Sequence, residues 1–301
     1  MPLLLIQTIQ RESVISFPAL NLTLDPPASF TVFGFRIYFY GVLIAIGFLL
    51  AILYCARRAP AFGLKGDDFY DLLLWLIPLS VLGARLYYVL FRLDYYLANP
   101  GEIFALRDGG LAIYGGVIAG VLTVWLLCRH KKIPMAAMLD LAVLGLLIGQ
   151  ILGRWGNFMN REAFGAETEI FCRMGLTDTA GNTIYVHPTF LYESLWNLIG
   201  FVFLHVWTKK GGRKYDGQCA LIYFFWYGLG RAWIEGLRTD SLYIGSTGIR
   251  VSQALSLALV LVTGCILIVQ SRRAHPSEAL YVNRAKAAQE NKEGDATHEQ
   301  L

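Results

Sequence analysis

The chain has 301 residues, of which 55% are hydrophobic and 16% are charged, and its mean hydropathy is +0.48. Soluble domains usually carry about 25% charged residues, so this composition excludes an ordinary soluble protein and indicates one embedded in a membrane. The formal net charge of +4 comes largely from basic clusters between apolar stretches, and it does not indicate a nucleic-acid partner.

Seven apolar stretches, each long enough to cross a bilayer as a helix, follow one another along the chain. They lie near residues 36–56, 70–91, 111–128, 135–153, 188–207, 217–236 and 250–270. A transmembrane helix needs roughly 20 apolar residues. The sequence therefore predicts an all-α integral membrane protein with seven transmembrane helices and a small extracytoplasmic loop region.

The same pattern divides the chain into three parts. We expect an extracytoplasmic N-terminal segment at residues 1–30 and a seven-helix membrane domain at 31–271, with an outer loop at about 160–187. Residues 272–301 become polar and charged, which predicts a disordered cytoplasmic tail.

Basic residues orient the predicted spans, because they gather after every odd stretch and after no even one. The clusters are Arg57, Arg58 and Lys65, then Arg129, Lys131 and Lys132, then Lys209, Lys210, Arg213 and Lys214, and finally Arg272 and Arg273. Loops rich in Lys and Arg stay on the cytoplasmic side of a membrane. The N-terminus is therefore expected outside the cell and the C-terminus in the cytoplasm.

A polar segment, Gly153 to Gly165, comes directly after the fourth stretch. It places Arg154, Asn157, Asn160 and Glu162 at one membrane face. Charge at such a depth is costly, so it usually serves a function. Gly153 and Gly156 are expected to let the chain leave the fourth span sharply and aim the arginine into a cavity.

The sixth stretch carries a second set of polar residues on one face. Tyr227, Arg231, Glu235 and Arg238 follow one another at spacings of four, four and three, which places them along one stripe of a helix. An isolated Arg231–Glu235 pair would indicate only a structural ion pair. Arg154 and Arg85 are expected at the same membrane face, however, and several arginines at one depth favour an anionic ligand such as a phosphate.

No cofactor is indicated by the sequence. The five cysteines do not have the spacing of a zinc site or a disulfide framework. The chain also has neither a phosphate-binding loop nor a convincing dinucleotide fingerprint. We therefore expect no metal and no organic cofactor.

The segment from Gly153 to Gly165 resembles the signature of the bacterial prolipoprotein diacylglyceryl transferases. The residues in register are Gly153, Arg154, Gly156, Asn157, Phe158, Asn160, Glu162 and Gly165. Further matches follow in order: Tyr40-Gly41, Gly83-Ala84-Arg85, Gly109-Gly110-Leu111, Tyr114-Gly115-Gly116, His187-Pro188, Tyr192-Glu193, and Tyr227-Gly228 with Arg231, Glu235 and Arg238. The likeness covers roughly residues 30–270.

This resemblance implies a seven-helix enzyme of the bacterial cytoplasmic (inner) membrane. Such an enzyme moves the diacylglyceryl group of phosphatidylglycerol to the lipobox cysteine thiol of a prolipoprotein, and glycerol phosphate leaves. Its partners would be phosphatidylglycerol, lipobox-containing prolipoproteins and membrane lipid, with no nucleic acid.

The resemblance also assigns roles to residues. Arg154 would bind the lipid phosphate and Arg231 would stabilise the leaving group, because positioned guanidinium groups stabilise developing negative charge. Glu162 and Glu235 would hold the arginines in place. The implied catalytic set is Arg154, Arg231, Glu162, Asn157, Tyr227 and Glu235; the implied phosphatidylglycerol-binding set is Arg154, Asn157, Asn160, Arg85, Tyr40, Tyr114 and Gly165.

One position departs from a common pattern of that family. Many members have a histidine where this chain has Tyr114, and a histidine could accept the proton of the substrate thiol near neutral pH. A phenol with a pKa near 10 is a poor base. Arg231, His187 or water could assist instead, and the sequence does not choose among them.

Two other classes of protein compete with the transferase. A transporter or channel for an organic anion would use the same arginines, but its polar residues should continue to the inner mouth, and here they gather on one side. An intramembrane protease would need a paired aspartate motif, a Gly-x-Ser-x-Gly elbow or a His-Glu-x-x-His motif, which the chain lacks.

Overall fold

The structure is a computed structural model that describes residues 13–105, 109–239, 243 and 247–298, with side chains as far as residue 291. Two compact units make up the chain. The first consists of Met1–Leu53, Ala142–Arg213 and Gln218–Ala274, and the second of Tyr54–Leu141, Lys214–Gly217 and His275–Leu301.

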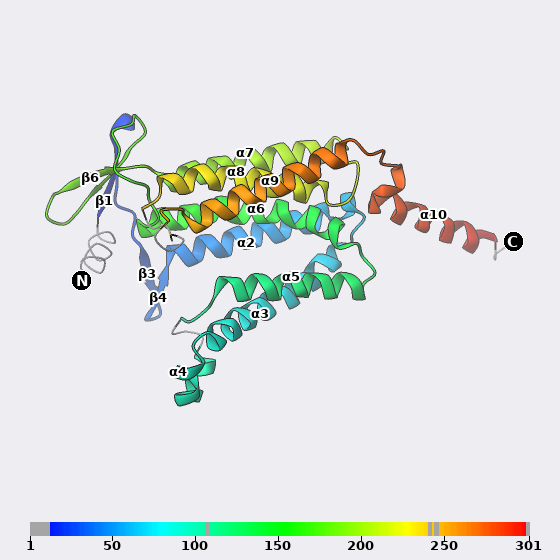
Figure 1. The fold of residues 1–301 in the computed structure, drawn as a ribbon, viewed down its shortest axis with the longest axis horizontal. Helices are drawn as coiled ribbons and strands as arrows, with labels where there is room; N and C mark the ends of the chain where they lie inside the picture. The colour runs from blue at the N-terminus through cyan, green and yellow to red at the C-terminus, as the bar shows by residue number, and fades with distance from the viewer. Residues whose placement is uncertain (1–12, 106–108, 240–242, 244–246, 299–301) are drawn as a thin grey trace. The chain divides into compact units, whose positions relative to one another are not determined.

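Helices occupy all seven of the predicted stretches (Figure 1). Six helices in the described part of the chain are long and apolar enough to cross a membrane: α2 (Phe39–Arg58), α3 (Gly66–Leu90), α5 (Ile113–His130), α6 (Met135–Asn160), α7 (Thr189–Lys209) and α9 (Val251–Ser271). The stretch at 217–236 forms helix α8 (Gln218–Leu237), which is not among these six. Helix α8 contains two charged residues, Arg231 and Glu235, together with two tyrosines and three glycines, and these lower its mean hydropathy.

Helix α6 corrects the prediction that the chain leaves the fourth span at Gly153. The helix continues to Asn160, so Arg154 and Asn157 stand on its last turns instead of on an exit loop. Both glycines serve helix packing. A Cβ atom on Gly156 would lie 2.7 Å from Cδ2 of Tyr40, and one on Gly153 would lie 3.4 Å from Cδ1 of Ile44. Because glycine has no Cβ atom, α2 can approach α6 closely at these two positions.

The protein is not all-α, because two small sheets precede and interrupt the helices. Strands β1 (Val14–Phe17), β2 (Leu22–Leu24), β5 (Met174–Thr177) and β6 (Thr183–Val186) form an antiparallel sheet in the order β2-β1-β5-β6. Ile15 lies opposite both Leu24 and Leu176. The described part of the N-terminal segment thus pairs with the loop expected at 160–187, a long-range pairing that a composition-based prediction does not reveal.

The inner face of this sheet packs on the end of α6 and the start of α7. Ile15, Met174, Leu176 and Val186 form one apolar cluster with Phe158 and Phe190. A separate hairpin of β3 (Ser29–Val32) and β4 (Phe35–Tyr38) leads directly into α2, and the amide of Phe39 donates to the carbonyl of Ala28. The sheet therefore fixes the chain on both sides of the polar segment.

Helices α7, α8 and α9 run side by side in the first unit (Figure 1). Trp196 on α7 and Trp226 on α8 each donate an indole N–H to the other's backbone carbonyl, at 3.0 Å. Gly200 and Gly230 allow this exchange, because a Cβ atom at either would lie within 2.5 Å of an indole nitrogen. The register of α7 against α8 is thereby set near the polar stripe of α8.

In the second unit, α3 and α5 pack closely through Gly83 and Gly115, whose backbones approach each other too closely for any side chain. Helix α4 (Leu93–Ala98) and a 3₁₀ turn, η3 (Pro100–Phe104), follow α3. Two further 3₁₀ turns lie at η2 (Ala59–Phe62) in this unit and η1 (Pro18–Leu20) in the first unit.

The tail differs from the disordered segment predicted by its composition. A 3₁₀ turn, η5 (Ser277–Ala279), is followed by helix α10 (Tyr281–His298). The carboxylate of Asp216 accepts the backbone N–H of Tyr281 and pairs with Arg284 at 3.0 Å, so it caps the start of α10. The segment is rich in Ala, Glu, Lys and Gln, which favour helix, and the cap lies too far away in sequence for composition to reveal it.

Candidate active site

The last turns of α6 bring together the polar residues of the 153–165 segment. Nη1 of Arg154 donates to Oδ1 of Asn157 at 3.0 Å, one turn further along the helix. The amide groups of Asn157 and Asn160 both donate to Oε1 of Glu162, at 2.9 and 3.3 Å. These contacts form one chain from Glu162 to Arg154, as expected for a carboxylate that holds an arginine in place.

Glu193 joins this group to the polar stripe of α8. Its two oxygens face different helices: Oε1 lies 2.6 Å from Nη2 of Arg154, and Oε2 lies 3.2 Å from Nη1 of Arg231. Glu193 is 5% exposed, so little water competes with either contact. A single buried carboxylate therefore aligns two guanidinium groups from α6 and α8.

Arg231 has a second carboxylate, Glu235, one turn further along α8. Nη2 of Arg231 lies 2.6 Å from Oε2 of Glu235, although this contact lacks the alignment of a good hydrogen bond. The sequence analysis predicted this pair. Arg250 holds the same end of the helix, because its guanidinium donates to the carbonyls of Glu235 and Arg238.

The two arginines keep most of their hydrogen-bonding capacity. A guanidinium has five N–H donors. Arg154 and Arg231 each use two guanidinium nitrogens in contacts with other described residues. The side chain of Arg154 remains 24% exposed and that of Arg231 16% exposed. Both therefore have N–H groups available for an incoming anion.

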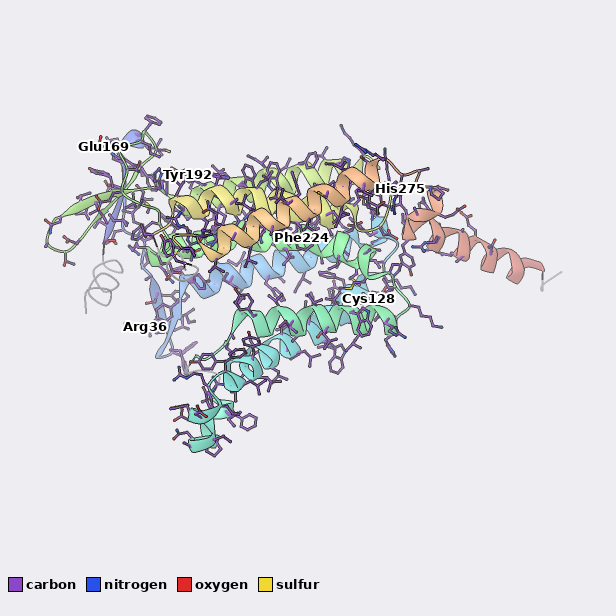
Figure 2. The ribbon with its side chains drawn as sticks, viewed as in Figure 1. Arg36, Cys128, Glu169, Tyr192, Phe224 and His275 are labelled. Atoms are coloured by element: carbon purple, nitrogen blue, oxygen red, sulfur yellow. The ribbon has the colours of Figure 1, made fainter. Side chains whose placement is uncertain are left out.

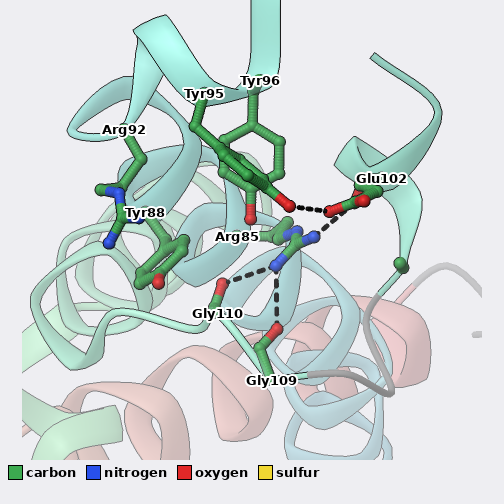
Figure 3. A pocket seen from close by; sticks show the side chains of 9 residues that line it. Arg85, Tyr88, Arg92, Tyr95, Tyr96, Glu102, Gly109 and Gly110 are labelled. Carbon is green, nitrogen blue, oxygen red and sulfur yellow. Dashed lines mark hydrogen bonds between the residues drawn. The ribbon is translucent and has the colours of Figure 1, made fainter. Parts of the chain in front are cut away.

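Arg85 differs from these two, although the sequence analysis placed it in the phosphate-binding set. It is 6% exposed, and it donates to the carbonyl oxygens of Glu102, Gly109 and Gly110 (Figure 3) and to that of Ile103. Four of its five donors are therefore committed to the backbone of η3 and of the two glycines before α5. Its geometry is that of a structural clamp beside a cavity of about 390 Å³.

Gly165 is another member of that set whose position indicates a structural role. Its amide donates to the carbonyl of His187 at 2.9 Å, and a Cβ atom on it would lie 2.6 Å from Cβ of His187. Buried Arg161 anchors the same segment through the carbonyl of Ser13 and the carboxylate of Asp25 at 2.9 Å. The glycine therefore permits a tight fold that presents Glu162 to Asn157.

The tyrosines of the predicted site have different surroundings. The ring of Tyr40 covers Gly156 on α6, next to Arg154 and Asn157. Tyr227 stands on α8 one turn before Arg231, and its ring stacks on Tyr223 with centroids 5.9 Å apart. Tyr114 lies at the start of α5 in the second unit and is 55% exposed.

His187, Tyr192 and Cys172 form a small cluster near the start of α7, where Figure 2 labels Tyr192. Nδ1 of His187 lies 3.4 Å from the hydroxyl of Tyr192, which in turn lies 3.4 Å from Sγ of Cys172. Burial lowers the pKa of His187 below its ordinary value near 6.5. The imidazole is therefore neutral at neutral pH.

Taken together, the first unit contains two partly free arginines, aligned by one buried carboxylate and supported by two more. Both arginines and the supporting Glu162 and Glu235 could be named from the sequence, whereas the role of Glu193 in linking the arginines could not. Its only signal was a carboxylate one residue after Tyr192 at the beginning of an apolar stretch. Helices α6 and α7 are long and apolar enough to cross a membrane, so the site is that of an integral membrane protein, and the chemistry of its guanidinium groups is suited to an anion.

Comparison with known proteins gives the family. The profile of the prolipoprotein diacylglyceryl transferases matches residues 27–269. Relatives named phosphatidylglycerol–prolipoprotein diacylglyceryl transferase include one from Enterococcus faecalis, 44% identical over 86% of this chain and 94% of its own. Another, from Lactiplantibacillus plantarum, is 43% identical over 85% and 94%, and one from Bacillus cereus is 41% identical over 79% and 89%.

The chain therefore belongs to the prolipoprotein diacylglyceryl transferase family, as its 153–165 segment predicted. It is a membrane transferase, and these relatives give no support to the transporter alternative.

Proposed function

We propose that this protein transfers the diacylglyceryl group of phosphatidylglycerol to the lipobox cysteine thiol of prolipoproteins and releases glycerol phosphate. The observation that carries the proposal is the convergence of Arg154 and Arg231 on Glu193, which leaves both guanidinium groups with donors for a phosphate. The names of the relatives supply the substrates, and the arginine pair supplies a site for the charge that the reaction creates.

In this reaction the thiol sulfur forms a bond to the glycerol carbon that carries the phosphate ester, and the bond from that carbon to oxygen breaks. The phosphodiester carries one negative charge, and the departing glycerol phosphate gains a second while the thiol loses its proton. Fixed guanidinium groups stabilise the transition state more than they stabilise the bound lipid, because the negative charge on the phosphate is larger in the transition state than in the bound lipid. Arg154 would hold the phosphate, and Arg231 would face the leaving oxygen.

The remaining residues of the site would act through these two arginines or on the lipid. Glu162, with Asn157 and Asn160, would keep Arg154 aimed, and Glu235 would do the same for Arg231. Tyr40 and Tyr227 would donate hydrogen bonds to phosphate or ester oxygens. Gly165 would shape the backbone beside Glu162, Arg85 would hold the backbone of its own unit, and no metal or organic cofactor would take part.

We also propose that α8 spans the membrane with the six more apolar helices, giving seven spans. Its polar stripe would face the protein interior, which is where charged residues of spanning helices lie. Because loops rich in Lys and Arg stay in the cytoplasm, the N-terminus and the loop at about 160–187 would then lie outside the cytoplasm and residues 208–215 inside.

A direct assay tests the proposed function. Purified protein is incubated with phosphatidylglycerol vesicles and a lipobox peptide, and the peptide mass and free glycerol phosphate are measured. We expect a heavier, more hydrophobic peptide and an equal amount of glycerol phosphate, and no product from a peptide with serine in place of the cysteine. An unmodified cysteine peptide would refute the transferase.

Labelling of cysteines tests the orientation. Exposed Cys172 should react with an impermeant maleimide in intact cells. In a Cys172→Ser background, a cysteine at position 210 (Lys210→Cys) should react only after the membrane is permeabilised. The opposite pattern would place the arginine site on the cytoplasmic side.

A further inference from the structure

A second layer of polar side chains lies one helical turn below the arginine site. Gln150 precedes Arg154 by four residues on α6, and Asn197 follows Glu193 by four on α7. Both therefore lie about 6 Å further from the polar ends of their helices. Tyr223 on α8 reaches the same layer, because its hydroxyl accepts a hydrogen bond from Nε2 of Gln150 at 2.8 Å.

This layer contains polar atoms that no described residue satisfies. Asn197 is 1% exposed, and neither its Oδ1 nor its Nδ2 has a hydrogen-bond partner in the described part of the chain. Oε1 of Gln150 is buried and equally without a described partner. Buried amides of this kind are costly between membrane helices, where a leucine would pack without any loss. Their presence directly beneath the arginines points to a ligand that completes them.

The unmet atoms define the chemistry of that ligand. Oε1 of Gln150 and Oδ1 of Asn197 need hydrogen-bond donors, whereas Nδ2 of Asn197 needs an acceptor. Ester carbonyls only accept hydrogen bonds, an ammonium head group only donates them, and a choline head group does neither. A diol both donates and accepts hydrogen bonds. The glycerol head group of phosphatidylglycerol carries two adjacent hydroxyl groups on the far side of the phosphate.

We propose that Gln150, Asn197 and Tyr223 form the head-group subsite that selects a glycerol phosphodiester. This inference rests on the proposed function: with the phosphate on Arg154 and Arg231, the head-group hydroxyls reach the amides one turn away. The acyl chains stay on the lipid side, because a layer with unmet polar atoms is unsuitable for them. The amide atoms of Gln150 and Asn197 are buried in this structure. The head group would therefore have to break the Gln150–Tyr223 hydrogen bond when it binds.

The test compares two lipids with the same charge and the same acyl chains. Phosphatidylglycerol and phosphatidylpropanol, which lacks both hydroxyls, are supplied separately to the purified protein with a lipobox peptide. We expect kcat/KM of the wild-type protein to be about 5- to 100-fold higher for phosphatidylglycerol, since each of the two matched hydroxyl groups contributes about two- to tenfold.

Asn197→Leu and Gln150→Leu should each reduce this ratio severalfold, mainly by slowing transfer from phosphatidylglycerol. Thr263→Val is the matched control, because Thr263 is a buried polar residue on α9 whose hydroxyl bonds the carbonyl of Leu259 on its own helix. It should keep the wild-type ratio. Thermal unfolding in the same detergent should show Asn197→Leu as stable as the wild type, because the substitution removes an unsatisfied buried amide.

Three results would overturn the inference. The first is a ratio of the two kcat/KM values near one in the wild-type protein. The second is a ratio that stays at its wild-type value in both leucine variants, which would mean that internal water satisfies the polar layer. If Asn197→Leu fails to accumulate, Gln150→Leu decides on the same ratio. The third is a wild-type protein that transfers from neither lipid, which refutes the proposed function itself and is thereby distinguishable from the other two.

Discussion

Replacing Glu193 by glutamine tests whether one carboxylate aligns both arginines. The substitution keeps the shape of the side chain but turns one oxygen into an amide nitrogen. Since Oε1 and Oε2 each face a guanidinium group, one arginine would then meet a donor instead of an acceptor. At least one of the two cations would lose its alignment.

The magnitude follows from what the arginines do. Loss of one aimed donor group from a site that stabilises developing charge costs about 2.7–4 kcal/mol, so we expect kcat to fall about 10²–10³-fold. Removing one partner of a buried ion pair costs about 3–5 kcal/mol of stability. Arg154 and Arg231 keep other partners and some solvent contact, so we expect a loss of only about 1–3 kcal/mol.

The kinetic signature separates alignment from simple binding. Glu193→Gln removes a negative charge near the phosphate, so KM for phosphatidylglycerol should not rise while kcat falls. Glu169→Gln is the matched control, because it makes the same charge change at an exposed position in the segment before α7 and should leave kcat unchanged. A Glu193→Gln variant with kcat within threefold of the wild type, or one that alters only KM, would refute the reasoning.

Three further predictions follow from the site. Arg154→Lys and Arg231→Lys should each lower kcat/KM at least about 100-fold while the protein still accumulates, because lysine keeps the charge but loses the planar fork of donors. Near-normal transfer by both variants would mean that these residues contribute only their positive charge. Tyr114→Phe should lower kcat/KM at most about tenfold, since it removes a single hydroxyl group and with it one hydrogen bond. A loss of several hundredfold would identify Tyr114 as the base. The lowered pKa of His187 means that folding disfavours its protonation, so the midpoint of thermal unfolding should drop as pH falls through about 6.5. His187→Gln should show a shallower drop between pH 7 and 5, and identical slopes would contradict this assignment.

The positions of the membrane helices could be predicted from the sequence, because hydrophobicity is a property of each local stretch. All seven predicted stretches contain a helix, and the residues of the 153–165 segment identified the family. The two sheets could not be predicted in this way. Strand β1 pairs with β5, and only the folded chain brings segments so far apart in sequence together.

The chemistry of the arginines shows the same division. The sequence predicted Arg85, Arg154 and Arg231 near one membrane face and determined that each is charged. Only the tertiary structure decided which of them keep N–H donors for an anion. Four donors of Arg85 meet backbone carbonyls, whereas Arg154 and Arg231 meet at Glu193 and keep donors in reserve. The physical reason is that a hydrogen bond depends on distance and direction between groups on different helices, and those are set by packing.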